Sequence, residues 1–164
     1  MGIQAQIDAA EKNLERLIDW VGKFDTKASI LLGIAIGMSG FLVTLAPPVS
    51  EWNITTYVVT TLSFALLLVT VMLISLATFP HTKSNNDSLL FFGTIPRHKT
   101  DEYVNAFGNQ SPEVYLKDLL IQCHTNSQIL NRKFSRLKWS YGTLTITLVP
   151  WVITIYQFRV IGTQ

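Results

Sequence analysis

Long apolar runs dominate the pattern of hydrophobic and polar positions along the chain. They cover residues 28–46, 54–79 and 139–158. Each run reaches the length of about 20 residues that a helix needs to cross the hydrocarbon core of a bilayer. The pattern therefore predicts an all-α membrane protein with three transmembrane helices at these positions.

The apolar positions of the N-terminal segment continue into the first run without a break. We predict a cytosolic amphipathic helix over residues 1–27, because apolar or small residues recur there at alternating steps of three and four. This spacing places them in a narrow stripe along one side of the helix, which we call a seam. The seam residues are Ile7, Ala10, Leu14, Leu17, Val21, Phe24 and Ala28, followed by Leu31, Ala35, Met38, Leu42 and Leu45. We expect one continuous helix, which ends before Pro47-Pro48 because a second proline cannot continue a helix.

A second long helix is predicted over residues 113–158. Ser111-Pro112-Glu113 supplies an N-cap serine, a proline at the first helical position and an acid in the first turn. The predicted seam of this helix is Leu116, Leu120, Cys123, Ser127, Leu130, Phe134, Leu137, Tyr141, Leu144, Leu148, Trp151 and Ile155. The seam crosses from cytosol into membrane at Trp139, and Pro150 is expected to kink the helix.

Residues 80–138 are expected to form a cytosolic loop followed by the start of this helix, and the loop is the irregular region large enough to shape a pocket. Clusters of Asn, Asp, Gly and Pro predict irregular structure over residues 81–111. The two continuous seams allow two interpretations. They transmit a cytosolic event mechanically to the spans, or they are static packing or oligomer contacts.

Composition and charge support the membrane assignment and orient it. The chain has 164 residues, of which 48% are hydrophobic and only 15% charged, whereas soluble domains carry about 25% charged residues. Lys and Arg occur in residues 1–27 and 80–138 but not in the connection 47–53. This distribution places the N-terminus in the cytoplasm and the connection outside, although Arg159 lies on the outer side. We expect no cleavable signal peptide, because the first apolar run follows a long charged stretch.

The spans contain no Asp, Glu, Lys, Arg or His, which argues against transporters and pumps. The three histidines lack the spacing of a zinc site, and we find no P-loop or nucleophile elbow. One cysteine, Cys123, excludes an internal disulfide. We therefore expect a protein that is not an enzyme and has no metal, cofactor or nucleic-acid partner.

Small and hydroxyl-bearing residues mark the spans. Ser29, Gly33 and Gly37 form a small-xxx-small row with Gly40 nearby, which permits close helix packing within one protomer or between subunits. The threonine hydroxyls of the second and third spans allow two interpretations. They line a polar seam between helices, or they hydrogen-bond to the backbone of their own helix, which is the commoner arrangement. They are Thr60, Thr70, Thr143, Thr145, Thr147 and Thr154.

A basic and aromatic cluster follows the second span. Arg97, His98 and Lys99 lie near Phe91-Phe92, with Tyr103 and Phe107 next along the chain. Positive charge beside aromatic faces can bind a phosphate and stack a base. The alternative, which the residues alone favour, is a basic loop that lies against anionic lipid headgroups.

The order of several motifs resembles a known family. Trp20 followed by Asp25-Thr26-Lys27-Ala28-Ser29 resembles the W-x4-D-x-K-A-S signature of Pycsar transmembrane effectors. A proline-ended second span, a Phe-Phe patch, Tyr-Leu-x-Asp-Leu at 115–119 and Asn131-Arg132-Lys133 extend the similarity over nearly the whole chain.

The resemblance implies an effector of a two-gene bacterial antiphage system. A partner pyrimidine nucleotide cyclase makes cyclic CMP or cyclic UMP on infection. The messenger activates the multi-pass inner-membrane effector, which impairs the membrane and kills the cell by abortive infection. We expect the effector to act as a homo-oligomer in the lipid bilayer. Residues 80–111 are too few for a β-roll nucleotide-binding domain.

The resemblance also implies roles for particular residues. Trp20, Asp25, Lys27, Ser29 and Lys133 belong to the gating or structural motif, and Asp25 and Lys133 are expected to pair if the two long helices pack together. If residues 80–138 act as the sensor of such an effector, the basic and aromatic cluster makes Phe92, Arg97, Lys99 and Tyr103 the expected ligand-binding residues. The small-residue row, apart from the resemblance, makes Gly33 and Gly37 the residues expected to pack helices. Two other functions remain: a non-signalling adaptor that binds a protein partner through its cytosolic helices, and a constitutive holin-like pore former.

Overall fold

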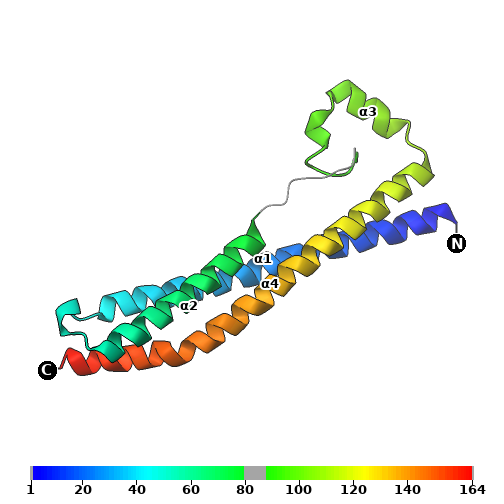
Figure 1. Cartoon of the computed structure of the whole chain (residues 1–164). Coiled ribbons are helices and arrows are strands. Elements are labelled where there is room, and N and C mark those ends of the chain that lie inside the picture. The colour runs from blue at the N-terminus through cyan, green and yellow to red at the C-terminus, as the bar shows by residue number, and fades with distance from the viewer. Residues whose placement is uncertain (1, 80–87, 164) are drawn as a thin grey trace. The chain divides into compact units, whose positions relative to one another are not determined.

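The structure of the chain is a computed structural model that describes residues 2–79 and 88–163 (Figure 1). The long helices are α1 (Ile3–Leu45), α2 (Ile54–Thr78) and α4 (Pro112–Ile161). Shorter elements are η1 (Val49–Glu51), η2 (Ile95–Arg97) and α3 (Thr100–Gly108). The described residues contain helices and no strands, which confirms the all-α prediction. Residues 80–87 of the expected sensor segment lie outside the described residues.

The three predicted spans fall on α1, α2 and α4. Each of these helices is long and apolar enough to cross a membrane. Helices α1 and α4 are each continuous from the charged segment into the span, as predicted, with 43 and 50 residues. Helix α2 ends at Thr78, so Phe79 is its C-cap rather than part of the span.

The chain forms two compact units. Unit 1 comprises residues 1–23 and 80–132, and unit 2 comprises residues 24–79 and 133–164. Helices α1 and α4 each contribute residues to both units. The apolar spans lie in unit 2, and most of the charged side chains lie in unit 1.

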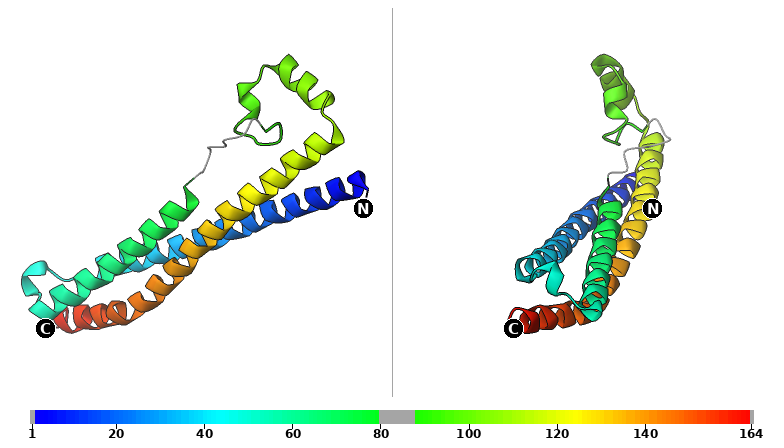
Figure 2. Two further views of the ribbon diagram at one scale, coloured as in Figure 1. Left: turned by 45° about the vertical axis from the view of Figure 1, so that its right-hand side comes forward. Right: turned by 60° about the vertical axis from the view of Figure 1, so that its left-hand side comes forward.

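Unit 2 is a bundle of three helices that lie side by side (Figures 1 and 2). One core cluster joins Phe24, Ala28 and Leu31 of α1 to Ile74 and Ala77 of α2 and Leu137 of α4. A second joins Ala35 and Met38 of α1 to Leu67 of α2, with Trp151 packed against them. The seam predicted for α1 therefore forms the core, since eight of its twelve positions are buried, namely Ile7, Ala10, Phe24, Ala28, Leu31, Ala35, Met38 and Leu42.

The seam predicted for α4 has the wrong register in several turns. Leu120, Tyr141 and Leu148 are exposed, as is Ser127, whereas the buried positions include Leu119, Ser140, Thr147 and Thr154. Leu119 and Leu120 are adjacent leucines, so hydrophobicity could not choose between them. In the span, apolar side chains lie on the surface of the bundle and small hydroxyl residues lie inside it, as is usual where lipid is the solvent.

Hydroxyl pairs join α2 to α4 inside unit 2. The Ser63 and Thr154 hydroxyls are 3.2 Å apart, and those of Thr70 and Thr143 are 2.9 Å apart. The hydroxyls of Ser63, Thr70 and Thr154 also lie within hydrogen-bond distance of carbonyls of their own helices. Each hydroxyl has one proton, so one member of a pair donates across to its partner, while the other donates to its own helix and accepts from that partner. Both interpretations of these residues are therefore correct. Among the residues that the structure describes, Thr145 bonds its own helix alone, at the Tyr141 carbonyl.

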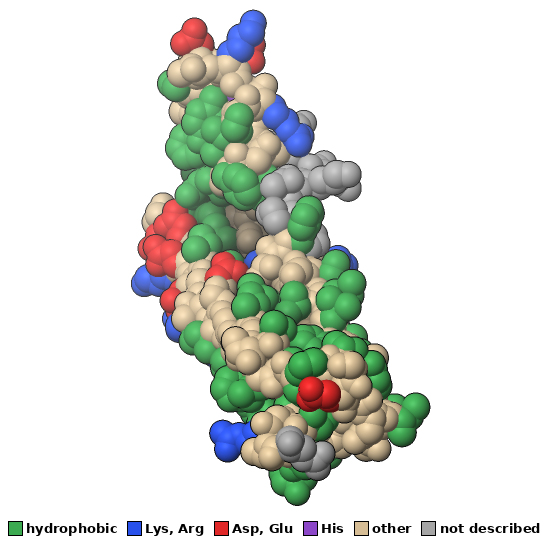
Figure 3. All heavy atoms as spheres, turned by 90° about the vertical axis from the view of Figure 1, so that its left-hand side faces the viewer, with side chains coloured by type: hydrophobic (Ala, Val, Ile, Leu, Met, Phe, Trp, Pro, Cys, Tyr) green, Lys and Arg blue, Asp and Glu red, His purple; other side chains and the backbone are tan. Residues whose placement is uncertain are grey.

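The glycines of α1 do not pack against another described helix within the protomer. A Cβ atom placed on Gly33, Gly37 or Gly40 meets no atom within 4 Å. Packing within one protomer is therefore the wrong interpretation of this row, and the inter-subunit alternative stays a prediction. On the face that Figure 3 shows, the surface formed by the spans is mostly hydrophobic or uncharged.

Helix α4 continues through Pro150 rather than ending there. Figure 1 shows the axis of α4 changing direction within its orange-to-red part, which includes Pro150. This agrees with the expected kink, because proline lacks the N–H that would bond to the carbonyl of residue 146 and its ring crowds that turn.

In unit 1, the start of α1 packs against the start of α4. Ile7 and Ala10 form a cluster with Leu119, and Leu14, Leu90 and Leu116 pack around it. The expectation of irregular structure over residues 81–111 is wrong for residues 100–108, which form α3. Helix α3 begins after Lys99, whose backbone N–H donates to the Glu102 carboxylate at 3.4 Å. Glu102 stands at the third helical position, where such a contact favours a helix start.

Candidate functional site

Asp118 fixes the chain that precedes η2. Its carboxylate accepts hydrogen bonds from the Ser88 hydroxyl at 2.9 Å and from the Leu89 backbone N–H at 3.2 Å. The Ser88 oxygen in turn accepts from the backbone N–H groups of Leu90 and Phe91. Thr94, fully buried, closes the turn by donating to the carbonyls of Ser88 and Phe91. A turn without regular helix is therefore held to α4 by one carboxylate.

Tyr103 holds the same turn to α3. Its hydroxyl donates to the Leu89 carbonyl at 3.1 Å. Its ring lies 6.0 Å from that of Phe107, which in turn lies 6.3 Å from the ring of Tyr115 on α4. Aromatic pairs at these centroid distances are favourable. The turn, α3 and the start of α4 thus form one connected structure.

Tyr115 ties this structure to α1. Its hydroxyl donates to the Glu11 carboxylate at 2.8 Å. Burial raises the pKa of Tyr115, and the hydrogen bond to Glu11 and its negative charge raise it further. The phenol therefore stays protonated at neutral pH and remains a donor.

The turn, α3 and the start of α4 line an open, solvent-accessible cavity of about 710 Å³. Its polar lining comes from Ser88 of the turn, His98 of the segment before α3, Asn109 and Gln110 after α3, and Ser111, Lys117 and Asp118 around the start of α4. Within the described part of the chain, the Lys117 ammonium and the His98 ring have no hydrogen-bond or ion-pair partner. The volume is within the range of about 300–1,000 Å³ typical of small-molecule sites. We call this space the α3–α4 cavity.

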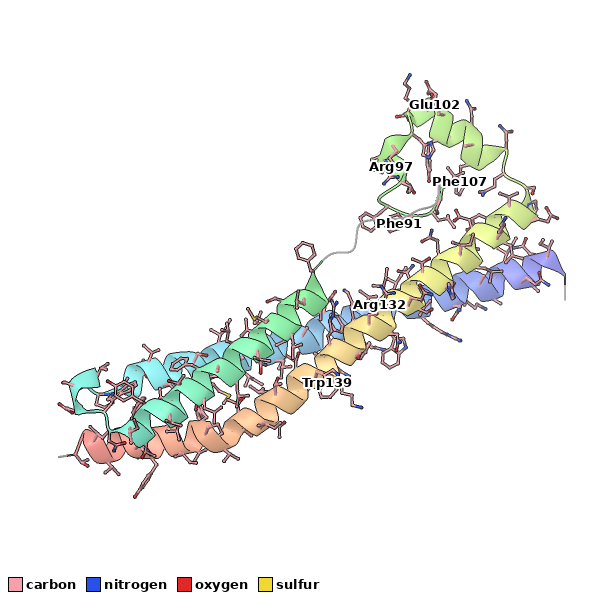
Figure 4. All side chains as sticks on the ribbon, in the orientation of Figure 1. Phe91, Arg97, Glu102, Phe107, Arg132 and Trp139 are labelled. Atoms are coloured by element: carbon pink, nitrogen blue, oxygen red, sulfur yellow. The ribbon has the colours of Figure 1, made fainter. Side chains whose placement is uncertain are left out.

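The four residues expected to bind a ligand do not line the α3–α4 cavity. Phe92 is 66% exposed, Arg97 and Lys99 are exposed, and the Tyr103 hydroxyl is engaged with Leu89. Figure 4 shows Arg97, Glu102 and Phe107 distributed around the chain that forms η2 and α3. Ligand binding at these four positions stays a prediction.

Asp25 and Lys133 lie together in unit 2, as the motif led us to expect. The Lys133 ammonium is 3.7 Å from the Asp25 carboxylate and 4.9 Å from the centre of the Phe24 ring. The Lys133 side chain is only 13% exposed, whereas that of Asp25 is 55% exposed. Phe24 also contacts Phe134 edge-on at 5.7 Å. A largely buried cation is therefore held by one carboxylate and one aromatic face, at the positions where α1 and α4 enter unit 2.

The other motif residues lie on exposed parts of α1. Trp20 is 47% exposed and stacks with the Lys23 ammonium, which lies 5.1 Å from its ring. Lys23 also pairs with Asp19 at 2.6 Å. Ser29 donates to the Asp25 carbonyl one turn earlier, and Lys27 is exposed. The structure does not bring these residues into one site.

Comparison with known proteins accounts for this set of motifs. The model of the Pycsar effector protein domain matches residues 9–158. The chain belongs to the Pycsar effector family. It is also similar to the Pycsar effector protein GmPycTM of Gulbenkiania mobilis, with 26% identity in an alignment of 175 positions that covers 89% of each chain. No solved structure matches the chain.

Membership of the Pycsar effector family makes this chain an antiphage defence effector with a transmembrane region. The match covers parts of both units. No role was predicted for Ser88, Lys117 or Asp118 from the sequence. The signal for Lys117 and Asp118 was the Tyr-Leu-x-Asp-Leu stretch at 115–119, whose residues make the contacts that hold unit 1 together. No sequence motif marked Ser88.

Proposed function

We propose that this chain is a messenger-gated effector of the bacterial inner membrane, with its N-terminus and unit 1 in the cytoplasm. Unit 1 binds a cyclic pyrimidine mononucleotide made by a partner cyclase, either cyclic CMP or cyclic UMP. Unit 2 then impairs the membrane, and the cell dies before phage mature. The observation that carries this proposal is the family match over residues 9–158, which includes parts of both the cavity-bearing unit and the membrane unit.

The protein acts through a change of state rather than through a catalysed reaction. A ligand that moves a two-state equilibrium from 1:99 to 99:1 needs about 5.5 kcal/mol of differential affinity. One bound phosphate with several polar contacts supplies part of this, and several sites in a homo-oligomer reduce what each must supply. The lipid bilayer is the target of the active state.

The continuity of α1 and α4 gives the signal a physical route. Each helix carries residues of unit 1 and then enters unit 2, without a described break, at the pair formed by Asp25 and Lys133. Breaking that pair would leave a largely buried ammonium without its carboxylate, which is costly. We propose that the pair favours the resting arrangement of the spans.

The proposal is tested in a bacterial host that expresses the chain with a pyrimidine nucleotide cyclase. Membrane potential is followed with a potential-sensitive dye, and a catalytically inactive cyclase is the control. We expect depolarisation and arrested growth only with the active cyclase. Depolarisation with the inactive cyclase would instead indicate a constitutive pore former. Intact potential in both strains, together with a stable protein partner on purification, would favour the adaptor.

A further inference from the structure

The α3–α4 cavity presents unpaired positive charge and side-chain amides to the same space. Lys117 on the second turn of α4 and His98 before α3 are its cationic or potentially cationic groups. Asp118 also lines it, but its carboxylate already accepts two hydrogen bonds from the 88–89 turn. Lys117 is therefore the strongest unpaired charge of the described lining. A cation in this position favours a ligand that carries one negative phosphate.

The cavity also lies at the N-terminal end of α4. Ser111 caps this end, where its hydroxyl accepts from the Val114 N–H at 3.4 Å. The positive end of a 50-residue helix adds to the charge of Lys117. Phosphate bound here would contact groups from the segment before α3 and from the start of α4 at the same time.

Two neutral amides, Asn109 and Gln110, complete the polar lining between α3 and α4. The Asn109 amide nitrogen donates to the Asn105 carbonyl at 2.9 Å, which fixes its orientation. The Gln110 side chain has no hydrogen-bond partner among the described residues. A side-chain amide offers one acceptor and two donors. It therefore complements the adjacent donor and acceptor on the Watson–Crick edge of either cytosine or uracil.

We propose that the α3–α4 cavity is the messenger site, in which Lys117 and His98 bind a cyclic phosphodiester and Gln110 binds the edge of a pyrimidine. This inference rests on the proposed function and gives it a location. It moves the site away from Phe92, Arg97 and Lys99. Binding draws the segment before α3 toward the first two turns of α4, and so acts directly on one of the helices that enter unit 2.

The test is calorimetric titration of the full chain in detergent with cyclic CMP, cyclic UMP, cyclic AMP and inorganic phosphate. Lys117→Met removes the charge and keeps the length of the side chain, and Lys99→Met is the matched control outside the cavity. We expect Lys117→Met to weaken binding of cyclic nucleotides at least tenfold, and Lys99→Met to change it less than twofold. Gln110→Ala should weaken binding of the pyrimidine nucleotide several-fold.

The possible results distinguish failure of the proposed site from failure of the proposed function. If the wild type binds a cyclic pyrimidine and Lys117→Met binds it equally well, the site is wrong and the proposed function stands. Loss of binding in Lys99→Met but not in Lys117→Met would return the site to the η2 segment. Inorganic phosphate binding as tightly as the nucleotide would overturn base recognition. A folded wild type that binds neither cyclic pyrimidine would overturn both proposals.

Discussion

At the scale of single residues, a few partly buried polar contacts decide how unit 1 is held together. Asp118, Tyr115 and Tyr103 each join two segments that are far apart in sequence. Hydrophobic periodicity cannot predict such contacts, because a polar residue on a helix is expected to face solvent unless its partner is known. The pairing of Asp25 with Lys133 was anticipated only through the family resemblance.

Cys123 reports on the packing of α1 against α4 in unit 1. The thiol is buried and donates to the Ala10 carbonyl at 3.5 Å. Burial raises the pKa of the thiol above its ordinary value of 9.0, against a smaller opposing contribution from Asn13. Because only the thiolate is the nucleophile, raising the pKa lowers reactivity at every pH below it.

We predict that Cys123 reacts with a maleimide at pH 8 at least tenfold more slowly in the folded protein than in denaturant. The matched control is Ser127→Cys in a Cys123→Ser background, since Ser127 is exposed on the same helix. The control should react rapidly in both conditions. Equal rates for Cys123 before and after denaturation would contradict the packing of α1 on α4.

At the scale of elements, sequence periodicity predicted the long helices well and their buried faces less well. The α1 seam was predicted correctly because polar neighbours mark its phase in unit 1 and the helix carries that phase without a break into the span. In the α4 span every face is apolar enough for lipid, so hydrophobicity does not mark the inside. There the hydroxyl residues mark it, through contacts such as that of Ser63 with Thr154. Helix α3 was missed because its nine residues are short and mostly polar.

Two buried threonines of the bundle should respond differently to the same substitution. The Thr154 hydroxyl bonds both Ser63 and the Pro150 carbonyl. The Thr60 hydroxyl is also buried but has no hydrogen-bond partner among the described residues. We expect Thr154→Val to lower the free energy of unfolding by about 0.6 kcal/mol, a typical value for an inter-helix hydrogen bond in a membrane.

Thr60→Val should leave the free energy of unfolding unchanged or raise it. The substitution removes a buried hydroxyl that makes no hydrogen bond with the described residues. Both variants replace a hydroxyl by a methyl group, so they differ only in the lost hydrogen bonds. Unfolding in mixed micelles with increasing sodium dodecyl sulfate measures both. Equal destabilisation by the two variants would contradict the hydrogen-bond assignment.

At the scale of the whole molecule, the open face of α1 predicts assembly. Gly33, Gly37 and Gly40 have free space around them, and small residues in a span allow a second helix to approach closely. We expect Gly37→Leu to abolish or weaken the homo-oligomer in detergent while leaving the protomer folded. Gly142→Leu is the matched control, because Gly142 of α4 is also exposed with open space around it.

Light scattering coupled to size-exclusion chromatography distinguishes these outcomes. The control should keep the mass of the wild type, and Gly37→Leu should shift toward the monomer. A wild type that is monomeric, or an unchanged mass in Gly37→Leu, would contradict assembly through this face of α1.

The central claim is that a cyclic pyrimidine nucleotide controls the integrity of the membrane around this protein. The most direct measurement is dye release from proteoliposomes of the purified chain, titrated with cyclic CMP, cyclic UMP and cyclic AMP. We predict release triggered by one cyclic pyrimidine and not by cyclic AMP, with the response shifted to higher concentration in Lys117→Met. Vesicles that stay tight with all three nucleotides, while circular dichroism shows the helices intact, would contradict the claim.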